Sequence, residues 1–243
     1  MPGPSEGRED ADVETSSEGY ARRFAGPLGA FFLDAQARTV LELLRPWPGA
    51  AVLEVGGGHA QLAGPLVDAG HAVTVYGSDP ACAARLRPWT DDGRVGFRAG
   101  DLLRAPWPDR SFDVVLAFRL LPHVTRWAAL IAELARLARR AVVVDYPTRR
   151  SLNVASGALF GLKRGVEGNT RPFTVFRDAE VASAFAAAGF FATARRPQFL
   201  LPMALYRALG SAPLARGLEG GARVLGLTAV LGSPVISRLE RRG

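Results

Sequence analysis

A short apolar run that ends in three consecutive glycines most constrains the fold of this 243-residue chain. The run, Ala51–Val55, contains a single acid, Glu54, and is followed by Gly56, Gly57 and Gly58. A short apolar run flanked by glycine fits a buried parallel strand better than a helix. The residues after the glycines can begin a helix. A strand, a glycine turn and a helix in this order predict a nucleotide-binding α/β unit.

The glycine turn departs from two common phosphate-binding patterns. A dinucleotide fingerprint needs a third glycine where Gln61 stands, and a P-loop needs a lysine that the turn lacks. The remaining pattern is acid-x-G-x-G-x-A, formed by Glu54, Gly56, Gly58 and Ala60. It resembles motif I of the class I S-adenosylmethionine (SAM)-dependent methyltransferases of the UbiE/type-11 kind, with Ala60 in place of the usual third glycine. Taken alone, the turn could also be architecture that binds no ligand.

Two later segments resemble the same family in the same order. Asp101 and Leu102 follow an apolar segment and a glycine. The resemblance implies that Asp101 accepts hydrogen bonds from the adenine amino group while Leu102 packs on the ring. Residues 111–124, SFDVVLAFRLLPHV, resemble the SFDxVxxxxxLxHV signature, which places Phe118 at the cofactor and His123 at the pocket rim. His123 is a candidate general base, or a residue that positions or caps its neighbours.

The resemblance implies further contacts with SAM. An acid at the end of the second strand usually binds both ribose hydroxyls, but Gly77 occupies the aligned position. We predict that Asp79, two residues later, binds the ribose, or that Ser78 and backbone groups do so. Glu54 is expected to orient the methionine end, and the three glycines to permit close approach. Tyr20 is expected either to reach the SAM carboxylate or to anchor a surface helix.

The order of apolar and glycine-rich segments predicts an α/β fold with a doubly wound, Rossmann-like sheet of seven strands. A helical insertion is expected near the C-terminus, between the sixth strand and an antiparallel seventh strand. The predicted organisation is a disordered acidic tail (1–18) and a single methyltransferase domain (19–243), which comprises N-terminal helices (19–48), a SAM-binding core (50–146) and two acceptor-binding insertions (147–175 and 199–231).

Composition limits the partners and the compartment. The net charge of +7 is uneven, because residues 1–19 contain six acids and one arginine, a balance of −5 that leaves +12 on the rest. The positively charged remainder of the chain could attract nucleic acid. No RNA-binding signature accompanies this charge, so nucleic acid is disfavoured as a partner. A single cysteine, Cys82, and no signal-peptide pattern indicate the cytoplasm. No membrane span and no metal site are expected, because no long apolar stretch occurs and the histidines are not at ligand spacing.

The implied reaction is direct transfer of the SAM methyl group to an acceptor that the protein aligns and shields from water. Apolar residues within 199–231 indicate a small hydrophobic acceptor, although they could equally pack on the domain or on a second subunit. A monomer and a homodimer are both consistent with the sequence. Two alternatives remain open. One is an RNA or protein methyltransferase, indicated only by the net charge of +12 on the residues after 19. The other is a SAM-binding module without turnover, indicated only by the missing acid at Gly77.

Overall fold

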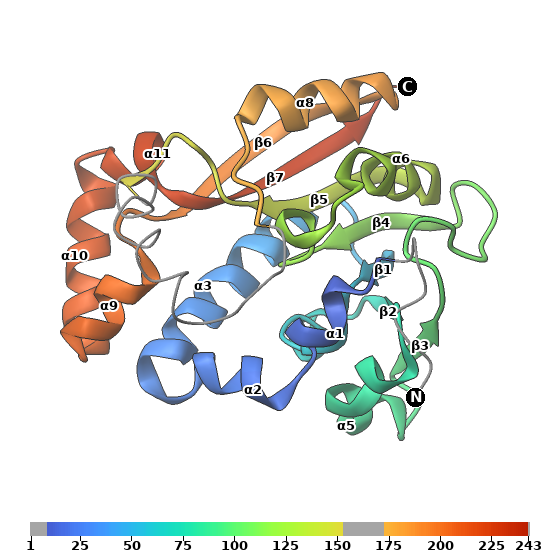
Figure 1. The fold of residues 1–243 in the computed structure, drawn as a ribbon, viewed down its shortest axis with the longest axis horizontal. Coiled ribbons are helices and arrows are strands. Elements are labelled where there is room, and N and C mark those ends of the chain that lie inside the picture. Colours follow the sequence, from blue (N-terminus) through green and yellow to red (C-terminus); the bar gives the residue numbers. More distant parts are fainter. Residues whose placement is uncertain (1–8, 153–172, 243) are drawn as a thin grey trace.

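A computed structural model describes residues 9–152 and 173–242 of the chain. Within these ranges, seven strands form one sheet in the order β3-β2-β1-β4-β5-β7-β6 (Figure 1). Neighbouring strands among β1 to β5 run parallel, and β7 runs antiparallel to both β5 and β6. The predicted seven-stranded doubly wound sheet is therefore confirmed. Its strands are β1 Ala51–Val55, β2 Ala72–Gly77, β3 Val95–Ala99, β4 Phe112–Ala117, β5 Ala138–Tyr146, β6 Phe190–Phe199 and β7 Ser233–Arg241.

Helices cover both faces of the sheet (Figure 1). Side chains of α6 and α8 pack in the hydrophobic cluster on one face, and side chains of α3 and α4 pack in the cluster on the other. The helices are α1 Ala11–Thr15, α2 Glu18–Ala21, α3 Gly26–Leu44, α4 Ala63–Asp68, α5 Arg87–Thr90, α6 Trp127–Leu137, α8 Asp178–Ala187, α9 Met203–Leu209, α10 Ala212–Val224 and α11 Leu227–Leu231. Short 3-10 turns are η1 Arg22–Phe24, η2 Gly57–His59, η3 Pro80–Leu86 and η4 Leu121–His123.

The central strands are apolar along their length because both of their faces are buried. In β4, Val115 and Ala117 belong to the cluster beneath α6, whereas Val114 and Leu116 belong to the cluster beneath α3. Alternate side chains of one strand therefore enter opposite layers of the core. This arrangement explains why a continuous apolar run, rather than an alternating one, marks the strands that carry the site.

The helical insertion between β6 and β7 packs on α3. Phe32 of α3 contacts Phe199 with ring centroids 4.9 Å apart, and Tyr206 of α9 with centroids 5.8 Å apart. The buried carboxylate of Glu219 in α10 accepts hydrogen bonds from the amide of Leu200, at 2.6 Å, and from the Tyr206 hydroxyl. The insertion is thereby joined to the domain through an aromatic cluster and a buried polar anchor.

Residues 9–18 differ from the predicted disorder, because their acids accept hydrogen bonds from the folded body. α1 packs against η2 and η3. Glu9 accepts a 2.9 Å hydrogen bond from the amide of Arg126, and Asp12 accepts one of 2.8 Å from the amide of Ser78. Composition alone assigns such acids to solvent, whereas here they satisfy backbone donors of distant segments.

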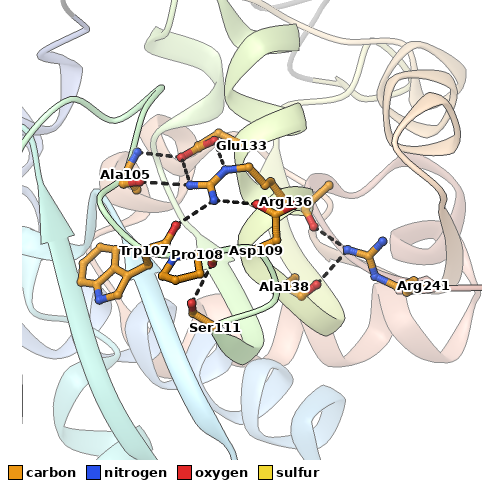
Figure 2. Close-up of polar contacts among 10 residues, drawn as sticks. Ala105, Trp107, Pro108, Asp109, Ser111, Glu133, Arg136, Ala138 and Arg241 are labelled. Carbon is orange, nitrogen blue, oxygen red and sulfur yellow. Dashed lines mark hydrogen bonds and ion pairs between the residues drawn. The ribbon is translucent and has the colours of Figure 1, made fainter.

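A polar network fixes the loop between β3 and β4 to α6 (Figure 2). Arg136 donates hydrogen bonds to the carbonyls of Trp107, at 2.7 Å, and Ala105, at 3.0 Å. Oε1 of Glu133 accepts from Arg136 at 2.7 Å and from the amide of Ala105 at 2.6 Å. Asp109 completes the network through an ion pair of 2.9 Å with Arg136. Residues of α6 therefore bind both the backbone of the loop after β3 and one of its side chains, that of Asp109.

Most of the insertion predicted at 147–175 lies outside the described residues. Thr148, near its start, forms an isolated bridge with Phe176, the residue that follows the insertion. In the described ranges, no helix is both long enough and apolar enough to cross a membrane.

Candidate functional site

The candidate site lies where the parallel strands β1, β2, β4 and β5 end. Glu54 is the penultimate residue of β1, Gly77 ends β2, Arg119 follows β4, and Asp145 lies near the end of β5. In open α/β sheets, ligands bind at the carboxyl ends of the strands, beside the point where the strand order reverses. β1 is that point in this sheet, because β2 and β4 flank it.

The turn after β1 brings its glycines against other side chains of the protein. Gly56 adopts a positive φ of 74°. A Cβ atom on Gly57 would lie 2.4 Å from Cδ of Glu54, and one on Gly58 would lie 2.2 Å from Oγ of Ser16. Any larger residue at 57 would displace the carboxyl group of Glu54, and any larger residue at 58 would displace the end of α1. The turn therefore requires glycine for packing as well as for backbone conformation.

Glu54 and His59 form a buried pair beside this turn. Nε2 of His59 lies 3.4 Å from Oε1 of Glu54, and neither Oε atom of Glu54 has a hydrogen-bond partner among the described residues. Burial raises the pKa of Glu54 to about 8, although the nearby Arg119 opposes this shift. Burial and Arg119 lower the pKa of His59 to about 3. Nδ1 of His59 accepts from the amide of Gln61, which assigns the ring proton to Nε2.

Arg119 connects three elements around the ends of β4 and β5. It has a positive φ of 57°, and its amide donates a 2.6 Å hydrogen bond to Oδ1 of Asp145. Its guanidinium donates to Gln36 of α3 at 3.0 Å and lies 4.0 Å from the ring centroid of Phe24. Burial raises the pKa of Asp145 to about 6, and these contacts with Arg119 oppose the shift.

Tyr20 lies at the edge of this group. Its ring centroid is 5.7 Å from that of Phe24 and 6.0 Å from the guanidinium carbon of Arg119. Its amide donates to Oγ of Ser17, the N-cap of α2. Tyr20 therefore both anchors a short surface helix and faces Arg119, so the two roles considered for it are compatible.

The structure separates Asp79 from the buried side chains at the end of β2. Asp79 is exposed, and its Oδ1 caps η3 by accepting from the amide of Ala81 at 2.8 Å. The carboxylate buried at this strand end belongs to Asp12 instead, which contacts Ser78 and Cys82. The predicted role of Asp79 at a ribose requires its carboxylate to leave its cap.

Asp101 and Leu102 follow β3 on the same edge of the sheet. Oδ1 of Asp101 accepts from the amide of Leu103 at 2.9 Å, and its carbonyl accepts from the hydroxyl of Tyr76 at 3.1 Å. Leu102 is buried, as is Phe118 after β4. The two side chains lie in opposite layers of the core, because Leu102 belongs to the cluster beneath α6 and Phe118 to the cluster beneath α3. A partly buried carboxylate such as that of Asp101 can accept hydrogen bonds from an aromatic amine while the neighbouring Leu102 covers its ring.

His123 stands apart from the Glu54 pair, at the end of η4. It is half-buried, its amide donates to the carbonyl of Leu120 at 2.9 Å, and its ring centroid lies 5.4 Å from that of Phe173. It thus borders the described end of the 147–175 segment. This position is compatible with the predicted rim role.

Sequence reasoning assigned no contact to Arg119 or Asp145, and it missed Asp12 entirely. Arg119 and Asp145 could have been found, because a charged residue at the end of a buried parallel strand points to the ligand edge. Asp12 carries no such signal, since it lies in a polar segment far from any predicted strand. In the described ranges, no three His, Cys, Asp or Glu side chains are grouped as metal ligands.

Comparison with known proteins matches the central part of this site, which includes Glu54, Asp101 and Arg119 but not Asp12, Tyr20 or Asp145. A family model described as "Methyltransferase domain" matches residues 53–143. A protein of Mycolicibacterium smegmatis, named a probable S-adenosylmethionine-dependent methyltransferase, is 31% identical over 109 residues, which are 45% of this chain and 42% of that protein. The chain thus spans less than half the length of this curated relative.

Solved structures share the fold at low sequence identity. Magnesium protoporphyrin IX methyltransferase from Synechocystis PCC 6803, with bound S-adenosylhomocysteine, has a TM-score of 0.64 and 16% identity, and the match covers 93% of this chain and 96% of that one. A [4+2]-cyclase has a TM-score of 0.59 and 18% identity over 86% of this chain and 80% of its own. The same architecture therefore occurs in a methyltransferase and in a protein named for a different reaction.

Proposed function

We propose that this chain, in which residues 53–143 match a methyltransferase domain, is a class I SAM-dependent methyltransferase that transfers the methyl group of SAM to a small, mainly apolar acceptor. When bound, SAM supplies a methyl group activated by its sulfonium centre, so the protein chiefly has to align the acceptor and exclude water. The observation that carries the proposal is the carboxyl group of Glu54, fully buried against Gly57 without a hydrogen-bond partner in the described chain. A buried carboxyl group that lies 3.4 Å from Nε2 of His59 and makes no hydrogen bond within the described residues fits a donor from a bound ligand.

The proposed contacts follow the strand ends. Glu54 accepts a hydrogen bond from the ammonium group of the methionine moiety, and the backbone of Gly56 to Gly58 lies along that moiety. Asp101 accepts from the adenine amino group, while Leu102 packs on its ring. Tyr20 lies at the carboxylate end of the methionine moiety, where the charge of the nearby Arg119 favours an anion.

A cavity of about 620 Å³ is the proposed acceptor pocket. It lies between the start of α3 and the insertion, and its lining includes Leu28, Phe32 and Pro213 together with Arg23 and Arg207. Its volume suits a small organic molecule. The apolar lining favours a hydrophobic acceptor, and the two arginines favour one that also carries an anionic group at its edge.

The cavity adjoins the strand-end site through Phe24. The guanidinium of Arg119 lies 4.0 Å from the centroid of the Phe24 ring, and that of Arg207 lies 6.0 Å from it. A single aromatic ring thus contacts one cation from the cofactor side and one from the pocket. His123 is proposed as a base only for an acceptor that must lose a proton, because a neutral amine or thiolate needs none.

Calorimetry on the full chain tests the cofactor. We expect SAM and S-adenosylhomocysteine to bind with micromolar dissociation constants, and Asp101→Ala to weaken binding at least about tenfold, by the loss of a charge-assisted hydrogen bond. Asp34→Ala is the matched control, because Asp34 is an exposed acid of α3 that pairs only with Arg38 in the described structure. Absence of binding by the folded chain would overturn the proposal.

Methyl transfer is then measured with SAM labelled in its methyl group. Apolar acceptors are offered as pairs that differ only in a carboxylate or a neutral carboxamide. We expect labelled product from the carboxylates, and a higher KM for them in Arg207→Gln. A carboxamide preferred over its carboxylate would contradict the anionic feature of the acceptor while leaving methyl transfer intact.

A SAM-binding module without turnover is the second candidate. One observation favours it: α1 lies against the glycine turn, with Ser16 in the space that a side chain at Gly58 would enter. SAM binding without transfer to any acceptor would support this candidate. An RNA or protein methyltransferase would be supported instead by transfer to that polymer, with nucleic-acid affinity falling steeply as salt rises.

A further inference from the structure

The carboxylate of Asp12 is completely buried at the end of β2. Oδ2 accepts a 2.8 Å hydrogen bond from the amide of Ser78 and lies 3.5 Å from Sγ of Cys82. Oδ1 has no hydrogen-bond partner among the described residues. A buried carboxylate oxygen without a donor is costly, so its presence indicates a donor that comes from outside the described residues.

Asp12 occupies the space next to Gly77. A Cβ atom on Gly77 would lie 3.3 Å from Oδ2 of Asp12 and 2.9 Å from Cβ of Cys82. A side chain at the last position of β2 would therefore enter the region that the Asp12 carboxylate fills. Gly77 has no side chain, and the carboxylate of Asp12 from α1 fills the space that an acidic side chain at 77 would occupy.

The position matters because of where nucleosides bind in this architecture. In nucleotide-binding α/β folds, an acid about 20 residues after the glycine turn accepts hydrogen bonds from the ribose. Gly77 stands at that spacing after Gly56. The described structure therefore offers a buried carboxylate at the expected place, although another part of the chain supplies it.

Asp12 is held in place from both sides along the chain. Thr15 and Ser16 donate their hydroxyls to its carbonyl at 3.1 and 2.7 Å, which closes the turn of α1. Upstream, Glu9 accepts from the amide of Arg126 at 2.9 Å. The carboxylate is thus positioned by local and tertiary hydrogen bonds, as a binding group must be.

We propose that Asp12 binds the ribose hydroxyls of SAM through Oδ1, and so replaces the acid that is missing at Gly77. This inference rests on the proposed function. It assigns to residues 9–18 a part in cofactor binding, and it leaves Asp79 as the cap of η3.

The test is calorimetric binding of S-adenosylhomocysteine and of its 2′-deoxy analogue to the full chain. Asp12→Asn keeps an oxygen for the Ser78 amide and so preserves packing, while Asp12→Ala removes the group. Asp79→Asn is the matched control, because it changes the other acid at this strand end. Thermal unfolding of every variant checks that it is folded.

We expect Asp12→Ala and Asp12→Asn to weaken binding of S-adenosylhomocysteine about tenfold or more, and to change binding of the 2′-deoxy analogue much less. Asp79→Asn should match the wild type. Unchanged or tighter binding by the folded Asp12 variants would overturn the inference and would make α1 a competitor for the site. Failure of the wild type itself to bind would instead refute the proposed function, and this inference with it.

Discussion

Nε2 of His59 lies 3.4 Å from Oε1 of Glu54, and both side chains are buried. The pKa of Glu54 is raised to about 8 and that of His59 is lowered to about 3, because burial disfavours the charged form of each group. At pH 7 the pair is therefore mainly uncharged, with a carboxylic acid that keeps its proton beside an imidazole that does not accept one.

The first prediction concerns stability between pH 6.5 and 8. The pKa of the Glu54 carboxyl rises from its ordinary value of 4.5 to about 8 in the folded chain. In this window the unfolded state has released the proton that the folded state retains, so stability falls as pH rises, by at most about 1.4 kcal/mol per pH unit. Glu54→Gln removes this contribution, and its unfolding free energy should decline less steeply.

Urea unfolding at several pH values across the window measures the two slopes. His59 does not interfere, because above pH 6.5 it is mainly neutral in both states, and Asp145, with a pKa of about 6, is mainly ionised. Equal slopes for the two proteins would show that Glu54 is already ionised in the folded chain.

The second prediction concerns protons released on binding. If Glu54 accepts a hydrogen bond from the ligand ammonium, it must ionise, and at pH 6.5 binding of S-adenosylhomocysteine should release about one proton. Calorimetry in buffers of different ionisation enthalpy counts that proton. Glu54→Gln should release none, so a release that persists in this variant would assign the proton to another group.

The third prediction concerns the network in Figure 2. Glu133 is buried and accepts from Ala105 and Arg136. Glu133→Ala leaves a buried amide and a guanidinium without their acceptor, so we expect a loss of roughly 2–4 kcal/mol in unfolding free energy. Asp109→Ala is the control, because Asp109 is 73% exposed and its ion pair is screened by solvent, for an expected change below about 1 kcal/mol.

Chemical denaturation of the two variants decides this point. A small effect of both would mean that the loop after β3 is held by its apolar contacts alone. A large effect of Asp109→Ala would mean that the exposed ion pair, and not the buried acceptor, fixes the loop.

The sheet was predictable because its central strands are continuous apolar runs bounded by glycine and turn residues. Val114 to Ala117 enter two opposite core layers, and a buried run of that kind has few other structures open to it. The antiparallel seventh strand and the helices before it were also predicted correctly. The family resemblance, rather than periodicity, supplied the expected order of these last elements.

The N-terminal segment was not predictable for a physical reason. Glu9 and Asp12 stabilise the fold through hydrogen bonds to Arg126 and Ser78, which are more than sixty residues away in sequence. Composition and periodicity register local patterns, and a carboxylate that satisfies a distant amide has the same local pattern as one in solvent. For Asp79 the local signal was present but described a turn: an Asx cap of η3.

The position of β7 between β5 and β6 has a consequence for biosynthesis. Residues 190–199 leave the ribosome before residues 233–241, yet within the described sheet β6 pairs only with β7. The parallel strands can assemble as they emerge, whereas β6 and the three helices after it must wait for β7. A nascent chain arrested before residue 233 should therefore leave the backbone hydrogen-bonding groups of β6 unpaired and open to chaperones.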